Sequence, residues 1–229
     1  MTEPIKINIW SDVACPWCYI GKRNLETGLV AFSDAEGSLP VEIEFHSFLL
    51  APETPVEFAG NQIDYLVGRK GLPEDQVRAM VDRVAGVAIA AGLEYDFDAL
   101  QPTNTMKAHQ LLHFAKGQGR QAEMKERLLR AYFVEGRHVG RVADLADLAA
   151  EIGLDRDDVL RSLQDDEYLA DVRADMRQAQ EYGINGVPFF VIDGRYGVSG
   201  AQPPAVFAQA LAQVAAERSE VAEAVPEGR

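Results

Sequence analysis

The sequence predicts an α/β fold in which a long all-helical segment interrupts a small sheet. Alternating apolar and polar residues, or short apolar runs, mark strands near both ends of the chain, at 5–10, 41–46 and 187–192. Between the second and third of these strands, apolar residues recur at helical spacing. A chain of 229 residues can form one large domain or one domain with a sizeable insertion.

The first predicted strand leads into the only two cysteines of the chain. Isoleucines at every second position from Ile5 to Ile9 indicate a strand with one buried face. The segment Cys15-Pro16-Trp17-Cys18 follows, and helix-forming residues continue from Tyr19 to Phe32. Pro16 suits the first helical position, because its φ is already helical and its missing N–H is not needed there. Cys15 is therefore expected at the junction of a strand and a helix.

This junction favours reactive sulfur chemistry. The free N–H groups and the dipole at a helix N-terminus favour negative charge, and the thiolate is the reactive form of cysteine. Pro16 and Trp17 carry no charge, so the helix N-terminus is expected to supply most of a lowering of the Cys15 pKa. Cys18 lies one turn further on, close enough to form a disulfide with Cys15. The spacing predicts a redox-active dithiol, with Cys15 attacking and Cys18 resolving, in the strand–Cys-x-x-Cys–helix context typical of thioredoxin-like proteins.

A zinc site and a pair of inert structural cysteines are the alternatives for these two residues. His109 and His113 have a spacing that suits a metal. However, a Cys2His2 site expects about 12–15 residues between its halves, and here most of a domain separates them. No third ligand is evident near the histidines. We expect no metal and no bound cofactor, only a redox-active disulfide between Cys15 and Cys18.

The strand at 41–46 completes the opening of a βαβ unit. Its parity places His46 on the polar face, which predicts a surface or loop-proximal residue rather than a catalytic base. Prolines and glycines from Ala51 onwards mark a loop, and helices are expected from there to Tyr182. The expected division is a thioredoxin-like domain at 1–50 and 183–218, a helical insertion domain at 51–182 whose last helix is shared between the two, and a flexible tail at 219–229.

The strand at 187–192 is followed by Asp193-Gly194, a strong signal for a hairpin turn. Pro188 at the start of this strand suits an edge or first-residue position, because proline cannot donate to the ladder. A cis Val187–Pro188 bond is physically allowed. Pro203-Pro204 then opens the last expected helix.

Composition limits the partners. The formal charge of −14 argues against nucleic acid and anionic membranes. No leader with a basic and then an apolar region is visible, and no stretch approaches the roughly 18 apolar residues of a membrane-spanning helix. We expect a cytoplasmic protein, where a lone cysteine pair is more often catalytic than structural.

Four segments together resemble the DsbA-like branch of the thioredoxin superfamily, specifically its FrnE-like cytosolic oxidoreductases. They are Cys15 to Lys22, Asn104 to His109, Gly186 to Val191 and Ser199 to Pro204. The resemblance runs from about residue 5 to residue 215 and implies a thioredoxin fold interrupted by a helical domain.

The same resemblance implies a protein disulfide oxidoreductase whose cis-proline loop, Val187–Pro188, packs beside Cys15. The backbone of Val187 would pair with an extended substrate, and His109 would face the active-site cleft. Asp12, the acid nearest to Cys15 in sequence, is expected to cap the turn, with assistance to proton transfer as the alternative. Some cytosolic relatives carry a second cysteine pair, which this chain lacks, so a relay through a second dithiol is excluded.

Two other functions stay open. Kappa-class glutathione transferases and 2-hydroxychromene-2-carboxylate isomerases look similar in fold but have serine at the position of Cys15, and a glutathione-dependent enzyme of aromatic or polyketide-like molecules is one alternative. A redox-sensing or chaperone-like module that binds clients is the other. The expected partners are thiols and disulfides of proteins or small molecules, with glutathione as a candidate cosubstrate, and the expected state is a monomer or homodimer.

Overall fold

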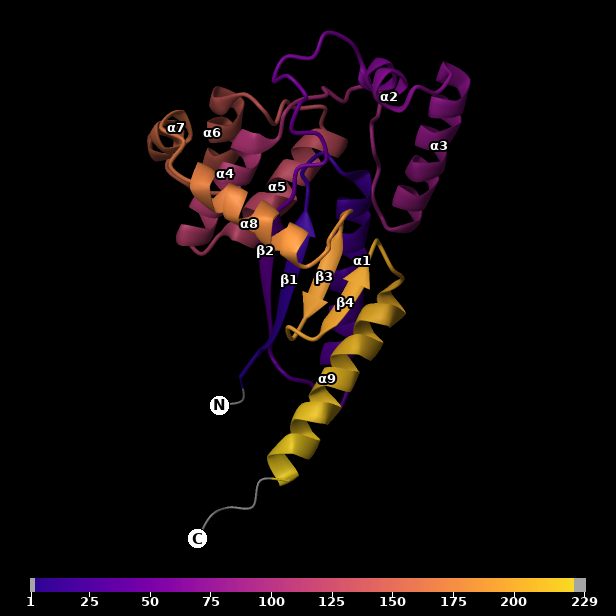
Figure 1. The fold of residues 1–229 in the computed structure, drawn as a ribbon, viewed down its shortest axis with the longest axis vertical. Helices are drawn as coiled ribbons and strands as arrows, with labels where there is room; N and C mark the ends of the chain where they lie inside the picture. Colours follow the sequence, from indigo (N-terminus) through magenta and orange to yellow (C-terminus); the bar gives the residue numbers. More distant parts are fainter. Residues whose placement is uncertain (1–2, 225–229) are drawn as a thin grey trace.

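A computed structural model describes residues 3–224 and confirms the α/β prediction. Four strands form one sheet in the order β2-β1-β3-β4 (Figure 1). Their bounds are β1 Ile5–Ser11, β2 Val41–Ser47, β3 Phe189–Ile192 and β4 Tyr196–Ser199. Strands β1 and β2 run parallel, as a βαβ unit requires, and β3 and β4 join the sheet antiparallel.

Helices make up most of the described chain. They are α1 Pro16–Ser33, α2 Gln62–Lys70, α3 Glu74–Ala90, α4 Met106–Gly117, α5 Gln121–Phe133, α6 Val142–Ala150, α7 Arg156–Gln164, α8 Leu169–Glu181 and α9 Pro204–Ala224. Helices α2 to α8 follow one another between β2 and β3. Figure 1 shows most of them gathered at one end of the sheet, while α9 runs along the sheet and past its other end.

One face of the sheet is covered by α1 and α9. The three isoleucines of β1 that alternate with polar residues are all buried here, as their spacing predicted. The apolar side chains that they meet come from β3, α1 and α9: Phe190, Ile192, Leu25, Phe32, Phe207, Leu211 and Val214. Each fully buried side chain of this size contributes about 1.5–3 kcal/mol relative to exposure. This core fixes α1, and with it the two cysteines, against the sheet.

The other face of the sheet is closed by α8 through a buried carboxylate. Asp175 of α8 accepts a hydrogen bond of 2.7 Å from the N–H of Ser47. Its oxygens also lie 2.9 Å from His46 Nδ1 and 3.0 Å from His113 Nε2. The His46 ring stacks on Trp10 at a centroid distance of 4.5 Å. A surface position of His46 is therefore wrong, because α8 covers the polar side of β2, although the residue lies one position before the end of the strand, next to the following loop.

Replacing Asp175 by alanine is expected to lower the free energy of unfolding by about 3 kcal/mol at neutral pH, because the buried Ser47 N–H and the partly buried rings of His46 and His113 lose their partner. Burial raises the pKa of Asp175, but His113, His46 and the Ser47 N–H outweigh it and hold the pKa well below its usual range. A carboxyl group with a depressed pKa stabilises the fold above its unfolded pKa of about 3.9, and this stabilisation is lost as the pH falls below that value. The difference between variant and wild type should therefore shrink below about pH 4.

Urea denaturation at neutral and acid pH measures this difference. Glu181→Ala, an exposed position on the same helix, is the control and should change stability by less than about 0.5 kcal/mol. If Asp175→Ala lowers the free energy of unfolding only slightly at neutral pH, or by the same amount at both pH values, the prediction is contradicted.

The C-terminal part of the chain follows the sequence prediction closely up to its last helix. Asp193 and Gly194 have φ of 56° and 66°, as the two central residues of a type I′ turn require, and the Arg195 N–H donates to the Ile192 carbonyl at 3.1 Å. Helix α9 continues to Ala224, so residues 219–224 are helical where a flexible tail was expected, and 225–229 lie outside the described residues. Just before these residues, Arg218 pairs with Asp193 and donates to the Glu3 carbonyl at 2.6 Å, which fastens α9 to the segments at the ends of β1 and β3.

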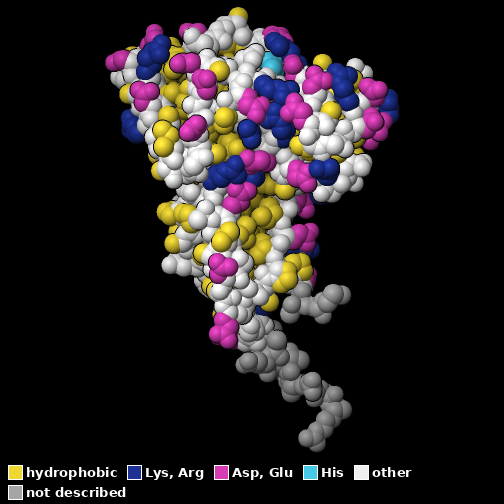
Figure 2. Space-filling model, turned by 180° about the vertical axis from the view of Figure 1, so that it is seen from behind, with side chains coloured by type: hydrophobic (Ala, Val, Ile, Leu, Met, Phe, Trp, Pro, Cys, Tyr) yellow, Lys and Arg dark blue, Asp and Glu magenta, His cyan; other side chains and the backbone are white. Residues whose placement is uncertain are grey.

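The end of the molecule at which most of the helices α2 to α8 gather has both positive and negative charges on its surface. Figure 2 shows basic and acidic side chains interspersed over this end of the molecule. Among residues 3–224, none of the helices combines the length and the apolar character that crossing a membrane demands.

Candidate active site

The two cysteines lie at the start of α1, where the sequence predicted them. Cys15 is the N-cap and Pro16 the first residue of the helix. Both cysteines are free thiols, each only 3% exposed. The Cys18 N–H donates to the Cys15 carbonyl at 3.0 Å within the first turn. Cys15 and the adjacent Pro16 and Trp17 line a pocket, whereas Cys18 lies behind Cys15 and is not part of the pocket wall.

The loop before β3 contacts Cys15, although the two are 172 residues apart in the sequence. The Val187–Pro188 peptide bond is cis, and Cys15 Sγ donates to the Val187 carbonyl at 3.5 Å. Close approach of α1 to this loop depends on Gly21, because a Cβ atom there would lie 2.9 Å from Pro188 Cγ. The structure thus brings together the dithiol and the proline loop that the resemblance placed beside it.

Asp12 joins the turn before Cys15 to the helical segment. Its carboxylate is buried and accepts hydrogen bonds of 2.8 Å from the Leu50 N–H and the Thr105 hydroxyl. The capping contact with the Ala14 N–H, expected from the sequence, is present at 3.4 Å and is the longest of its contacts. Burial raises the pKa of Asp12, but His109, the Leu50 N–H and Thr105 outweigh it and lower the pKa. Asp12 is therefore a charged anchor as well as a turn cap.

His109 lies behind Asp12. Its ring is fully buried, its Nε2 is 3.2 Å from Asp12 Oδ1, and it is not part of the pocket wall. Burial lowers its pKa against the attraction of Asp12. The expectation that His109 faces the cleft is wrong, because α4 holds the ring inside the helical core and Asp12 stands between it and the pocket.

Lys125 of α5 is a site residue that reasoning from the sequence missed. It is 1% exposed, its Nζ donates to the Ser11 carbonyl at 3.4 Å, and it lies 5.7 Å from the centre of the Phe45 ring. Burial lowers its pKa. A signal was present, since Lys125 lies three residues before Leu128 and seven before Tyr132, on the face of the helix predicted to be inward.

The expected lowering of the Cys15 pKa by the helix N-terminus is not found. The neighbouring Cys18, burial and the negative charge of Asp12 raise the pKa of the Cys15 thiol. Burial also opposes ionisation of Cys18, but the contact with Cys15, the Lys125 ammonium and the Ser11 hydroxyl outweigh it and lower the pKa of Cys18. The Lys125 cation therefore favours a negative charge on the inner sulfur, Cys18.

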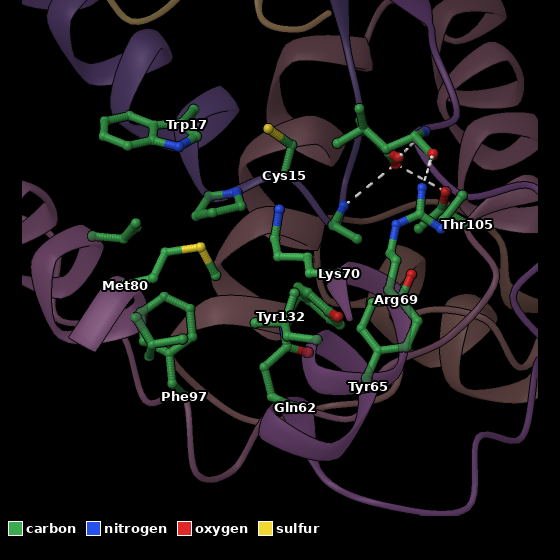
Figure 3. A pocket seen from close by; sticks show the side chains of 18 of the residues that line it. Cys15, Trp17, Gln62, Tyr65, Arg69, Lys70, Met80, Phe97, Thr105 and Tyr132 are labelled. Carbon is green, nitrogen blue, oxygen red and sulfur yellow. Dashed lines mark hydrogen bonds between the residues drawn. The ribbon is translucent and has the colours of Figure 1, made fainter. Parts of the chain in front are cut away.

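The pocket in front of Cys15 has a volume of about 550 Å³. Residues of α2 and α3 form the wall opposite the dithiol (Figure 3). Asp12, Thr105 and Tyr132 also border the cavity. A pocket of this size with a reactive group on its wall suits a ligand site.

A sheet of this topology with a Cys-x-x-Cys pair at the N-terminus of α1, opposite a cis-proline, defines the protein as thioredoxin-like. Residues 6–212 match the model of the DSBA-like thioredoxin domain. The chain is 40% identical to the "probable DsbA oxidoreductase SCO1869 from Streptomyces coelicolor", with a TM-score of 0.85 over 93% of this chain and 91% of that one. The chain therefore belongs to the DSBA-like thioredoxin domain family, which confirms the resemblance.

Two further proteins are similar to this chain. The chain is 28% identical over 211 residues to the "Uncharacterized protein YwbO" of Bacillus subtilis (strain 168), covering 90% of this chain and 96% of that protein. It shares the fold of the "Cytosolic disulfide reductase DsbM from Pseudomonas aeruginosa with GSH", at 20% identity and a TM-score of 0.62, covering 91% and 98% of the two chains.

Proposed function

We propose that this protein is a thiol–disulfide oxidoreductase that works through Cys15 and Cys18. The observation that carries the proposal is the pair of free thiols at the start of α1, one on the pocket wall against the Val187 carbonyl and one behind it near Lys125. This arrangement separates an outer sulfur, which a substrate can reach, from an inner sulfur that a cation favours as thiolate.

The reducing direction uses both sulfurs in turn. The Cys15 thiolate attacks one sulfur of a substrate disulfide, so that a mixed disulfide forms and the first substrate thiolate leaves. The Cys18 thiolate then attacks the Cys15 sulfur, the Cys15–Cys18 disulfide forms, and the second substrate thiolate leaves. Two electrons pass from the dithiol to the substrate, and the oxidation of a substrate dithiol is the reverse.

The charges of the site assign a role to each sulfur. Before attack, the proton of Cys15 passes to the Cys18 thiolate. After attack, Cys15 is bonded to substrate and carries no charge. Cys18 then gives its proton to the first substrate thiolate that has left and ionises beside Lys125 without competition from a second thiolate. Lys125 therefore acts on the resolving step, and access from the pocket selects Cys15 for the attacking step.

A glutathione-dependent isomerase or transferase of small aromatic molecules is the second candidate. The pocket supports it because it is large enough for such a molecule, and the fold is shared with the structure of the disulfide reductase DsbM with GSH. That chemistry requires no second cysteine, whereas disulfide exchange requires Cys18. A client-binding module would require neither cysteine for binding.

Substrate trapping with Cys18→Ser tests the proposal. Because the mixed disulfide on Cys15 cannot be resolved in this variant, substrates should remain attached in a cell lysate that is quenched with acid, alkylated and analysed by mass spectrometry. The double variant Cys15→Ser/Cys18→Ser is the matched control.

Proteins or small thiols bound to Cys15 in the single variant but not in the double variant would support exchange and identify the substrates. Glutathione as the sole adduct, with an unchanged wild-type rate of small-molecule isomerisation in Cys18→Ser, would favour the second candidate. Absence of any adduct on Cys15 would refute the exchange function.

A further inference from the structure

The wall of the pocket beside Cys15 is mainly apolar. The apolar side chains come from the active-site turn, α2, α3 and the loop after α3: Trp17, Leu66, Met80, Val84, Val87 and Phe97. Trp17 and Val87 are 41% and 40% exposed, so apolar surface is open to a ligand at the mouth. A small molecule with an apolar body would bury this surface together with its own.

The charged side chains of the wall are three cations and one carboxylate. Arg69, Lys70 and Arg83 come from α2 and α3, and Asp12 is the carboxylate. Asp12 is buried and already accepts hydrogen bonds from donors of the protein. Arg69 pairs with Glu53, whereas Lys70 and Arg83 form no ion pair with any side chain that the structure describes.

The positive charge of Lys70 and Arg83 is opposite in sign to the net charge of the molecule. The chain carries a formal charge of −14, and on the face seen in Figure 2 the basic side chains lie beside acidic ones. In the view of Figure 3, Lys70 extends across the pocket in the direction of Cys15. A local excess of positive charge beside an apolar wall complements a ligand that is apolar and anionic.

We propose that this pocket binds small amphipathic disulfides, and the thiols derived from them, that have an aromatic or other apolar body and an anionic group such as a carboxylate. The apolar wall takes the body, Lys70 and Arg83 bind the anion, and the disulfide lies against Cys15. This proposal deepens the proposed exchange function and rests on it. Each turnover converts one disulfide into two thiols, while Cys15 and Cys18 supply the two electrons and become a disulfide.

Single-turnover oxidation of the reduced protein at low ionic strength tests the proposal. The probes are para-carboxyphenyl disulfide, the uncharged para-carbamoylphenyl disulfide, and dithiodiglycolate, which has the anion without the ring. Each rate constant is divided by the rate constant of the same probe with dithiothreitol, so that intrinsic differences in reactivity cancel.

The carboxyphenyl probe is expected to react about tenfold faster than the carbamoyl probe, because the cations attract it. It should also exceed dithiodiglycolate by about tenfold or more, because the ring buries apolar surface. Lys70→Glu/Arg83→Glu should reduce the ratio of the carboxyphenyl rate to the carbamoyl rate to about one or below, which abolishes the first preference. Lys6→Glu/Arg161→Glu, with the same change of net charge at exposed positions outside the pocket, should preserve it.

Equal rates for the charged and uncharged aryl probes in the wild-type protein would overturn the proposal. So would a control variant that loses the preference as fully as the pocket variant, since the effect would then follow net charge. Oxidation by every probe without preference would leave the exchange function intact while refuting this pocket assignment. Failure of all probes to oxidise the dithiol would refute both.

Discussion

Replacement of Asp12 by alanine is expected to lower the free energy of unfolding by about 3–5 kcal/mol, the largest stability effect that we predict for a single residue. The Thr105 hydroxyl and the His109 ring would lose their partner in a buried site, and the partly buried Leu50 N–H would lose its acceptor. Each unsatisfied buried donor costs about 1–3 kcal/mol. Since a domain of this kind is stable by about 5–15 kcal/mol, the variant should fold but denature at much lower urea concentration.

The same carboxylate opposes ionisation of Cys15, so its removal should make that thiol more reactive. Asp12→Asn is the better variant for this measurement, because the amide oxygen can still accept from the Leu50 N–H. The measurement is best made in a Cys18→Ser background, which removes the neighbouring thiol. There, Asp12→Asn should lower the pKa of Cys15, as read from the pH profile of its alkylation by iodoacetamide.

Asp34→Ala, an exposed acid at the other end of α1, is the control for both readouts. It should change stability by less than about 0.5 kcal/mol and leave the alkylation profile unchanged. A Cys15 pKa that rises in Asp12→Asn, or an Asp12→Ala variant as stable as the control, would contradict this account of Asp12.

The sequence alone predicts those features of the site that depend on local chemistry. Alternation places the isoleucines of β1 on the buried face, proline preference places Pro16 at the first helical position, and Asp193-Gly194 encodes its own turn. These signals act over a few residues, and the structure agrees with each of them.

The parts that sequence reasoning missed are contacts between distant segments. Asp12 and Thr105 are separated by 93 residues and His46 and Asp175 by 129, and no local pattern encodes which carboxylate meets which donor. His46 illustrates the consequence: parity correctly places it on the polar side of β2, but α8 then buries that side. For the same reason, the sequence could not show that a cation from α5 lies behind Cys18.

Lys125→Met is expected to make the protein more reducing and at the same time no less stable. Lys125 is a buried cation whose Nζ has one weak hydrogen bond and no carboxylate partner within the described chain. Burial opposes the charge of Lys125 more strongly than Cys18, Asp12 and Cys15 favour it, so an apolar side chain of similar length should be neutral or stabilising there. Loss of the ammonium should raise the pKa of Cys18, because the cation no longer favours its thiolate.

The change in redox potential follows from the same charge. A thiolate that a cation stabilises favours the dithiol form, as the reduced form of a strong oxidant does, so loss of the cation favours the disulfide. A rise of one unit in the pKa of an ionised thiol corresponds to about 1.4 kcal/mol, which is about 30 mV for this two-electron couple. The potential should therefore become more negative by about 30 mV at a pH where the wild-type thiolate is populated.

Equilibration with glutathione buffers measures the potential, and urea denaturation of the reduced protein measures the stability. Lys116→Met, which removes the same charge from the exposed face of α4, is the control and should leave the potential unchanged. A variant that is destabilised with an unchanged potential would show that Lys125 supports packing only. A more reducing and equally stable variant would show that this buried charge is retained for its effect on Cys18, since the fold does not require it.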